Sequence, residues 1–269
     1  MEGETVCEVI QSRSHSFKAG EVVRAMTGWC THAVVDATKV KHVETHGAPV
    51  STALGVLGMP GFTAYGGMKV IGQPKPKETV VIAAASGPVG SLVGQIAKLA
   101  GARAVGVAGG KEKCDYVRDE LGFDAVVDHR SQAFASELSS ACPDGVDVYF
   151  ENVGGHVWEA VSPLLNLYAR VPVCGLIAQY NGPGDSPGDR LPALMSSILR
   201  RSLLLRGFIN TEFLDTHFDA FKKEIGPLVA SGKIKYREDV VDGLENAPEA
   251  FIGMLSGGNF GKLLVRVGR

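Results

Sequence analysis

Two patterns of hydrophobic positions follow one another along the chain, and they predict two kinds of structure. Up to about residue 70, short β-rich pieces such as ETVCEVI and EVVRAM are separated by glycines. This spacing is typical of antiparallel strands in a small barrel or sandwich. From Thr79 onward, short runs of branched apolar residues alternate with helical stretches. That alternation predicts βαβ units that build a parallel sheet.

Six apolar runs predict the strands of this parallel sheet: 79–85, 103–109, 124–129, 146–154, 169–177 and 202–209. The main helices are expected at 88–101, 111–122, 212–231 and 245–256. Because crossovers between parallel strands are right-handed, these elements predict a doubly wound α/β domain. After Lys233 the sequence returns to β texture and ends in the strand LLVRV. We expect this tail to rejoin the N-terminal β layer, which would make the first domain discontinuous.

The stretch IAAASGPVGSLVGQ carries the clearest chemical signal, because it follows a predicted strand and opens a predicted helix. That context is required of a dinucleotide-binding fingerprint. Ala85, Gly87 and Gly90 hold its three positions, with Pro88 and Val89 between the two glycines. Gly87 lets the backbone approach a pyrophosphate, Gly90 lets helix and strand pack closely, and the helix N-terminus favours phosphate. A glycine-containing turn without a ligand is the alternative, and the repeated strand–helix alternation favours the dinucleotide.

The end of the second strand indicates which dinucleotide binds. NAD sites place an acidic residue there to hold the ribose 2′-hydroxyl. Here the strand ends in Ala-Gly-Gly at 108–110, followed by Lys111, Glu112 and Lys113. The small residues leave room for a 2′-phosphate and the two lysines supply charge, so NADPH is favoured over NADH. Glu112 leaves NADH open, and a solvated helix start is the alternative interpretation of the lysines.

Further polar residues follow the ends of the predicted strands: His129, Glu151, Asn152, Tyr180 and Asn210. Each of these residue types is more often a helix cap or a turn residue than a ligand contact. Ligands of open α/β sheets, however, bind beyond the carboxyl ends of the strands. The shared position at one sheet edge therefore makes all five candidates for the cofactor site.

Composition and charge exclude several functional classes. The 269 residues are 45% hydrophobic and carry a formal net charge of -2, which gives no support to a nucleic-acid or anionic-membrane partner. The five cysteines are odd in number and widely spaced, so no disulfide framework is expected and a reducing compartment fits best. The N-terminus lacks the pattern of a secretory signal and no apolar run is long enough to span a bilayer. We expect a cytoplasmic protein.

The sequence gives little support to a metal site or to a serine hydrolase. His42 and His46 stand four residues apart with Glu44 between them. This is not the H-E-x-x-H arrangement of zinc enzymes, and no third ligand is obvious, so we expect no metal site. The sequence contains no G-x-S-x-G motif, which argues against a serine hydrolase.

Several long blocks of sequence together resemble the medium-chain dehydrogenase/reductase family. Within it, the chain is most similar to the zinc-free, NADPH-dependent double-bond reductases, the group of curcumin, prostaglandin and alkenal reductases. The matching blocks are MPGFTAYGG (59–67), AAASGPVGSLVGQIAKLAG (83–101), VAGGKEKC (107–114), LGFDAVVDH (121–129), YFENVGG (149–155), PVCGLIAQYN (172–181), GLENAPEAFIGML (243–255) and GNFGKLLVRV (258–267).

The resemblance implies a Rossmann domain over 71–231 and a GroES-like β-barrel domain over 1–70 and 232–269, with the cofactor between them. Family members begin earlier than this chain, so the barrel is expected to be incomplete, and missing strands would leave unpaired edges. The resemblance also implies residue roles. Lys113 would hold the 2′-phosphate, and His129 stands where many relatives have tyrosine. The implied cofactor contacts are Gly87, Pro88, Val89, Gly90, Lys113, His129, Asn152, Cys174, Gly175, Leu176, Ile177, Ala178, Gln179, Tyr180, Phe208, Ile209, Asn210 and Asn259.

The implied activity is reduction of the carbon–carbon double bond of an α,β-unsaturated ketone or aldehyde by hydride transfer from NADPH to the β-carbon. Tyr65 and Tyr180 lie where family tyrosines approach substrate. Three alternatives stay open: an NADPH quinone oxidoreductase of the same family, an NADPH-binding protein impaired by its incomplete barrel, and a zinc alcohol dehydrogenase. Relatives are commonly dimers joined through the edge of the Rossmann sheet, and the apolar strand SLLLRGFI at 202–209 suits such an edge. We therefore expect a homodimer that acts on a small-molecule enone or alkenal.

Overall fold

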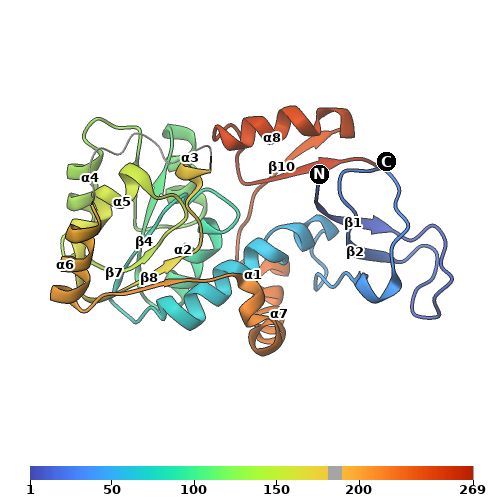
Figure 1. Ribbon diagram of the computed structural model, residues 1–269, viewed down its shortest axis with the longest axis horizontal. Coiled ribbons are helices and arrows are strands. Elements are labelled where there is room, and N and C mark those ends of the chain that lie inside the picture. The colour runs from blue at the N-terminus through green and yellow to red at the C-terminus, as the bar shows by residue number, and fades with distance from the viewer. Residues whose placement is uncertain (181–189, 269) are drawn as a thin grey trace.

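A six-stranded parallel sheet forms the centre of the larger part of the molecule (Figure 1). The computed structural model describes residues 1–180 and 190–268. The strands follow the order β6-β5-β4-β7-β8-β9, so the chain reverses direction across the sheet between β4 and β7. This confirms the predicted doubly wound α/β fold and places a crevice at the carboxyl ends of these two strands. The strands are β4 (Thr79–Ile82), β5 (Arg103–Ala108), β6 (Ala125–Asp128), β7 (Val146–Phe150), β8 (Leu165–Val173) and β9 (Leu204–Gly207).

Helices cover both faces of this sheet. They are α2 (Gly90–Leu99), α3 (Lys111–Asp115), α4 (Phe134–Ala141), α5 (Gly155–Val161) and α6 (Leu191–Arg201), and α3 continues as a π-helical turn over Tyr116–Glu120. A further helix, α7 (Leu214–Ala230), packs against α1 (Met59–Gly66). Single 3-10 turns occur at Ala37–Lys39, Val50–Leu54, Ser162–Leu164, Ile177–Gln179, Asn210–Phe213 and Leu244–Asn246. The predicted helices 88–101 and 212–231 correspond to α2 and α7.

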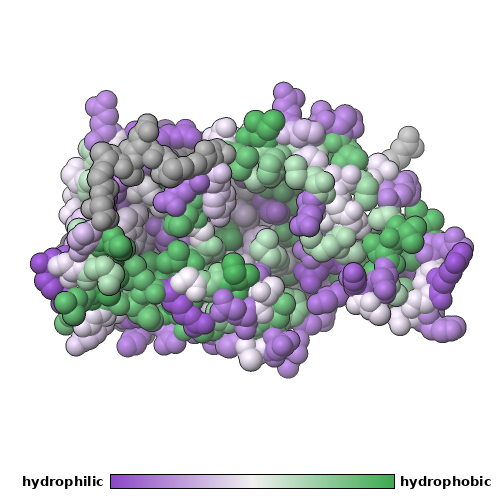
Figure 2. Space-filling model, viewed as in Figure 1, coloured by the Kyte–Doolittle hydropathy of each residue, from purple (hydrophilic) through white to green (hydrophobic). Residues whose placement is uncertain are grey.

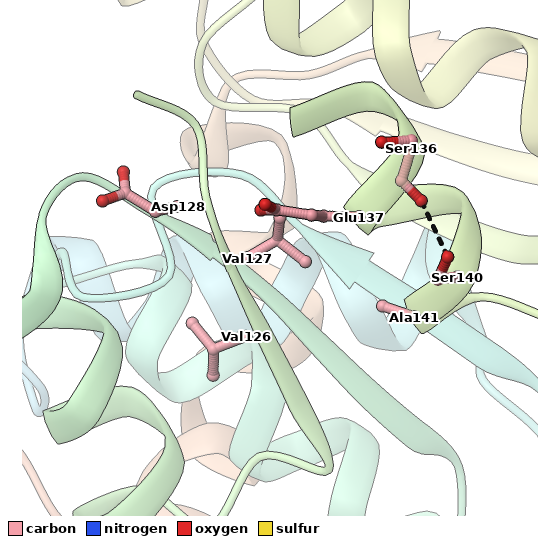
Figure 3. A pocket seen from close by; sticks show the side chains of 7 residues that line it. All are labelled: Val126, Val127, Asp128, Ser136, Glu137, Ser140 and Ala141. Carbon is pink, nitrogen blue, oxygen red and sulfur yellow. Dashed lines mark hydrogen bonds between the residues drawn. The ribbon is translucent and has the colours of Figure 1, made fainter. Parts of the chain in front are cut away.

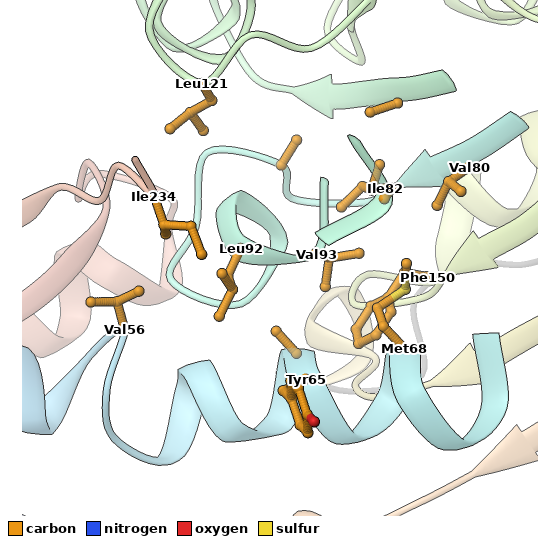
Figure 4. Packing of buried hydrophobic residues seen from close by; sticks show 14 of the residues in the cluster. Val56, Tyr65, Met68, Val80, Ile82, Leu92, Val93, Leu121, Phe150 and Ile234 are labelled. Carbon is orange, nitrogen blue, oxygen red and sulfur yellow. The ribbon is translucent and has the colours of Figure 1, made fainter. Parts of the chain in front are cut away.

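Two apolar cores lie on the two faces of the sheet, because successive residues of a strand point in opposite directions. Val80 and Ile82 of β4 belong to the core beneath α2 (Figure 4). Val81 and Ala83 belong to the core beneath α4 and α5. A strand buried on both faces explains why its sequence is continuously apolar rather than alternating.

Helix α1 (Met59–Gly66), continued by a π-helical segment over Gly67–Gly72, occupies a region that the sequence predicted as β structure. Its glycines disfavour a helix by intrinsic propensity. Packing overrides this preference: a methyl group on Gly61 would lie 1.8 Å from the Val56 carbonyl oxygen, and one on Gly67 would lie 2.7 Å from the Phe150 ring. The glycines therefore let α1 approach its neighbours closely.

The N-terminal segment forms the predicted antiparallel layer, with β1 (Glu4–Glu8), β2 (Val22–Met26) and β3 (Lys41–His42). The C-terminal tail forms its own two-stranded parallel sheet from β10 (Glu238–Asp242) and β11 (Lys262–Arg266), joined through α8 (Ala247–Leu255). The tail packs against the N-terminal layer without sharing its ladder: the rings of Trp29 and Phe251 meet edge to face at 6.0 Å. Figure 1 shows both chain ends in this smaller part of the molecule.

Candidate functional site

The turn after β4 has the geometry of a pyrophosphate cradle. Ala84 adopts a left-handed backbone with φ 51, and its carbonyl accepts a hydrogen bond from the Gly87 N–H at 2.9 Å. A methyl group on Gly90 would lie 2.4 Å from the same carbonyl oxygen, so only glycine lets α2 start this close to β4. No side chain caps the first turn of α2. Its N-terminal amide groups and partial positive charge therefore suit a phosphate ligand. Pro88 and Val89 complete the turn, both half-buried.

The end of β7 is tied to the end of β4 by side chains. Asn152 donates its side-chain amide to the Ala83 carbonyl at 2.8 Å. Glu151, only 2% exposed, accepts hydrogen bonds from the backbone of Val153 at 2.7 Å and Gly154 at 2.8 Å. Burial raises the pKa of the Glu151 carboxyl above its ordinary value, although these donors oppose the shift. The carboxyl group thus fixes the turn that carries Asn152.

The segment after β8 is fastened over this edge. The Cys174 N–H donates to the Glu151 carbonyl at 2.9 Å, and the Ile177 N–H donates to the Asn152 carbonyl at 3.3 Å. Burial, followed by the charge of Glu151, raises the pKa of the Cys174 thiol to about 11. A thiol with such a pKa stays protonated and is a poor nucleophile. The contact of Cys174 with the end of β7 is made through its backbone N–H.

Tyr180 stands at the end of the same segment and is 63% exposed. A methyl group on Gly175 would lie 3.1 Å from its hydroxyl oxygen, so the ring folds back over this glycine. Leu176 and Gln179 face Gly154 at the start of α5, and Ala178 faces Gly155. The structure thus brings the predicted residues of 174–180 together with Asn152 at the carboxyl edge of the sheet.

A cluster of basic groups surrounds the end of β5. A methyl group on Gly109 would lie 2.6 Å from His129 Nε2 and 3.0 Å from Arg130 Nε, and one on Gly110 would lie 3.5 Å from Arg130 Nη1. Lys113 donates its ammonium to the Gly257 carbonyl at 2.8 Å. Burial, then the charge of Arg130, lowers the pKa of Lys113. Sequence reasoning missed Arg130. The signal was present, because Arg130 directly follows His129 after the strand that neighbours β5.

Four further predicted contacts lie in different surroundings: Phe208, Ile209, Asn210 and Asn259. Phe208 is buried against Phe150, with ring centroids 6.3 Å apart, whereas Ile209 beside it is 66% exposed. Asn210 begins the next 3-10 turn and is half-buried. The Asn259 amide donates within its own loop, to the Gly261 carbonyl at 2.8 Å. The same loop contains Gly257, whose carbonyl accepts the hydrogen bond from Lys113, so the loop contacts the basic cluster.

The structure does not bring Tyr65 to this edge. Tyr65 is 3% exposed, and its ring lies 5.6 Å from that of Phe221 on α7. In Figure 4 it points from α1 away from Leu92 and Val93 of α2. Burial, followed by the nearby Glu224, raises the pKa of Tyr65 to about 12, and among the described residues its hydroxyl has no hydrogen-bond partner. This position gives no support to the predicted role of Tyr65 at the substrate.

Two cavities have walls that do not include the turn at 84–90. One, of about 460 Å³, has Tyr65, Lys69, Glu224 and the C-terminal half of α2 in its walls. The other, of about 420 Å³, lies on the outer side of β6 against α4 (Figure 3). Among the described residues, the walls of the latter carry the carboxylates of Asp128 and Glu137 but no cationic side chain, so this cavity does not suit a phosphate group.

The two histidines considered for a metal make unrelated contacts. The ring of His42 stacks on Phe17 with centroids 4.7 Å apart, whereas His46 lies against Gly226 of α7. Within residues 1–180 and 190–268, no group of three or more His, Cys, Asp or Glu side chains could hold a metal ion. The same residues include no helix with the length and apolarity needed to cross a membrane.

The sequence of this chain matches known families of oxidoreductases and individual NADPH-dependent reductases. Residues 88–223 match the family described as zinc-binding dehydrogenase, and residues 1–43 match the N-terminal domain of oxidoreductase. The chain is 50% identical over 268 residues to the NADPH-dependent curcumin reductase of Escherichia coli K12, covering 99% of this chain and 78% of that protein. The chain belongs to the medium-chain dehydrogenase/reductase family. This confirms the resemblance derived from the sequence blocks.

Two more members of the family are similar over nearly the whole chain. The NADP⁺-dependent 2-alkenal reductase of Nicotiana tabacum is 39% identical and matches 99% of this chain and 77% of its own length. The crystal structure of CurA from Vibrio vulnificus in complex with NADPH superposes with a TM-score of 0.96 at 49% identity, covering 100% of this chain and 80% of that one.

Proposed function

We propose that this protein is an NADPH-dependent oxidoreductase that reduces the carbon–carbon double bond of α,β-unsaturated ketones and aldehydes. The observation that carries the proposal is the coincidence of two findings. The turn at 84–90 is shaped for a pyrophosphate, and the chain is 50% identical to an NADPH-dependent curcumin reductase over 99% of its length. The similarity to a 2-alkenal reductase supports an enone or alkenal as the substrate class.

The residues at the carboxyl edge fit such a cofactor. Gly87 and Gly90 leave room that a side chain would fill, and the uncapped start of α2 offers amide groups to the phosphates. The small residues Gly109 and Gly110 leave space beside cationic groups for a 2′-phosphate. The segment 175–179, held to Asn152 and Val153 by backbone hydrogen bonds, would lie along the nicotinamide and its ribose. Phe208 supplies an apolar wall at the same end.

When bound, NADPH supplies a hydride, and the β-carbon of the unsaturated carbonyl compound receives it. Negative charge then develops on the carbonyl oxygen of the substrate, which needs a hydrogen-bond donor fixed in advance. We assign this role to the Tyr180 hydroxyl, because it is exposed over Gly175 at the carboxyl edge. A tyrosine or water can supply the proton that completes the reduction.

The activity is tested by mixing the purified protein with NADPH and a panel of enones, alkenals and quinones, and following loss of the reduced-nicotinamide absorbance. We expect oxidation of NADPH with enones or alkenals and a product saturated at the former double bond. Oxidation with quinones alone would place the protein among the quinone oxidoreductases. Binding of NADPH without oxidation by any acceptor would support a binding protein without activity.

The role of Tyr180 is tested with Tyr180→Phe, and the exposed Tyr168 on β8 offers a matched control. Loss of one donor to a developing oxyanion lowers turnover by about a hundredfold. We expect this loss in kcat for Tyr180→Phe, with NADPH affinity retained, and no change for Tyr168→Phe. Equal kcat in the two variants would show that the Tyr180 hydroxyl does not serve the reaction.

We also propose that two copies of the chain associate through the β9 edge of the sheet. β9 ends the sheet order, and exposed apolar side chains lie at this end, including Leu167, Leu199 and Leu204. Figure 2 shows apolar residues gathered over the end of the molecule that carries α6 and β8. Light scattering of the purified protein should give the mass of a dimer, and a Leu204→Lys variant should shift it to a monomer.

The state of the cysteines supports a cellular location for the protein. All five are free thiols, a state that a reducing environment maintains. This supports our proposal of a cytoplasmic protein. Fractionation of cells that express the tagged full-length protein would test it.

A further inference from the structure

The basic cluster at the end of β5 contains a cation without a partner. Among the described residues, the guanidinium of Arg130 makes no hydrogen bond or ion pair, and the side chain is exposed. Its backbone N–H is fixed by the Asp128 carboxylate at 2.9 Å, and its side chain lies over Gly109 and Gly110. Lys113, by contrast, is engaged by the Gly257 carbonyl. A planar guanidinium beside two glycines is suited to bidentate recognition of a phosphate.

A pair of histidines lies beside this guanidinium. His129 Nδ1 is 3.3 Å from His156 Nε2, and the ring centroids are 5.3 Å apart. His129 Nε2 is directed to Gly109, where a methyl group would lie only 2.6 Å away. His156 comes from the first turn of α5 and packs edge to face on Phe134 at 5.9 Å. One ring nitrogen of His129 thus faces His156 and the other faces the space above Gly109.

We propose that Arg130 is a principal reader of the 2′-phosphate and that the His129–His156 pair makes the preference for NADPH over NADH depend on pH. The inference rests on the proposed function, because it needs the adenosine end of the cofactor at the end of β5. The inference goes beyond the proposed function by naming two residues, Arg130 and His156, and a titratable histidine pair that affect the choice of cofactor.

The chemistry of the pair sets the direction of the effect. Each neutral imidazole has one N–H, so His156 Nε2–H can donate to His129 Nδ1 while His129 Nε2–H donates to a phosphate oxygen above Gly109. Protonation of the pair keeps both hydrogen bonds and adds a positive charge beside the phosphate anion. Bound phosphate therefore favours the protonated pair. By linkage, NADPH binding takes up a proton, and the affinity for NADPH relative to NADH rises as pH falls.

The surroundings disfavour the charged form of His129 when no phosphate is bound. The charged and titratable groups that face His129 are His156 on α5, Arg130 and Asp128 at the end of β6, and Lys113 on α3. Burial, then the charges of His156 and Arg130, lowers the pKa of His129, while Asp128 opposes them. The change in preference is therefore expected on the acidic side of neutral pH.

The test measures dissociation constants of NADPH and NADH by isothermal titration calorimetry between about pH 6 and pH 8, a range in which histidine charge changes. For the wild-type protein, we expect the NADPH/NADH preference to rise about tenfold toward the acidic end, the equivalent of one pKa unit. Arg130→Gln should weaken NADPH about tenfold at every pH and leave NADH within twofold. The exposed Arg118, which pairs with Asp115, gives the matched control Arg118→Gln.

The 2′-phosphate of NADPH also titrates, and this titration is common to all variants. Comparison of the histidine variants with the wild type therefore isolates the contribution of the His129–His156 pair. His129→Gln should flatten the pH dependence of the preference. His156→Gln retains an acceptor for His129 but removes a competing charge, so the midpoint should move to higher pH. The exposed His32, replaced in His32→Gln, should behave as wild type. Parallel curves for wild type and His129→Gln, or equal weakening of both nucleotides by Arg130→Gln, would overturn the inference. Failure of the wild type to bind NADPH at any pH would instead overturn the proposed function.

Discussion

The contact between α2 and β4 permits a quantitative prediction from a single methyl group. In Gly90→Ala, the added carbon would lie 2.4 Å from the Ala84 carbonyl oxygen and 3.0 Å from the Ala85 Cα atom. Both are backbone atoms, so no side chain can rotate away and α2 itself must move from the strand. Overpacking of this kind typically costs about 1–3 kcal/mol. We take about 2 kcal/mol as the expected loss in free energy of unfolding.

Thermal unfolding with and without NADPH is the assay. For a chain of this size, about 1 kcal/mol corresponds to roughly 2–4 °C, so Gly90→Ala should lower Tm by roughly 4–8 °C. NADPH at a hundred times its dissociation constant should add about 2.7 kcal/mol to the wild type. The variant should lose most of that gain, because the helix start that faces the phosphates has been displaced.

Two other glycines calibrate the result. Gly253 lies within α8 with nothing within 4 Å of an added methyl group, so Gly253→Ala should raise stability by about 0.5–1 kcal/mol. In Gly87→Ala the methyl group would lie 3.1 Å from the Ala84 carbonyl, so stability should fall less than in Gly90→Ala while the NADPH-induced gain disappears. If Gly90→Ala melts as the wild type does and keeps its full response to NADPH, the close packing described for this turn is wrong.

Three further substitutions test separate parts of the structure. Lys113→Ala should weaken NADPH about tenfold more than NADH, as expected for loss of one charge-assisted phosphate contact, whereas the exposed Lys111→Ala should change neither dissociation constant. Burial alone would raise the pKa of Glu78. The hydrogen bonds from Arg170 and the Lys75 backbone, together with the charges of both residues, outweigh burial and hold the pKa below its ordinary value. These contacts therefore contribute stability above the ordinary pKa, which is lost as pH falls through the lowered pKa. Arg170→Met should cost about 2 kcal/mol in urea unfolding at neutral pH and remove this acid-side loss; an unchanged pH profile would contradict the assignment. Tyr65→Phe should leave kcat within twofold, since the hydroxyl lies away from the carboxyl edge, and a large drop would restore Tyr65 as a substrate residue.

The sequence predicted those parts of the fold that depend on a continuous stretch of chain, such as buried strands and the nucleotide-binding turn. The apolar runs of the parallel sheet are long and uniform because strands such as β4 are buried on both faces, and the nucleotide turn is a local motif. Helix α1 was missed because its glycines oppose a helix by propensity, and only contacts with Val56 and Phe150 reveal why they are needed. Such contacts join segments far apart in the sequence and leave no local signal.

The candidate site was predictable to the same extent. Lys113 and Asn152 could be found because they follow strands whose ends meet at one edge. The roles of Arg130 and His156 depend on how α5 lies beside the end of β6, which no spacing encodes. The role of Tyr65 stays a prediction for a related reason. The sequence gives its position along the chain, but the direction of its side chain depends on the rotation of α1 against α7.

The central position of β4 also has a dynamic consequence. All four of its residues are at most 3% exposed, and the strand pairs with neighbours on both sides, whereas β9 pairs on one side only. Its amides can exchange with deuterated solvent only when the whole domain opens, while those of β9 can exchange by local fraying. The strand that delivers the phosphate turn is thus expected to be among the slowest-exchanging parts of the sheet, so that the nucleotide is held by a rigid part of the molecule.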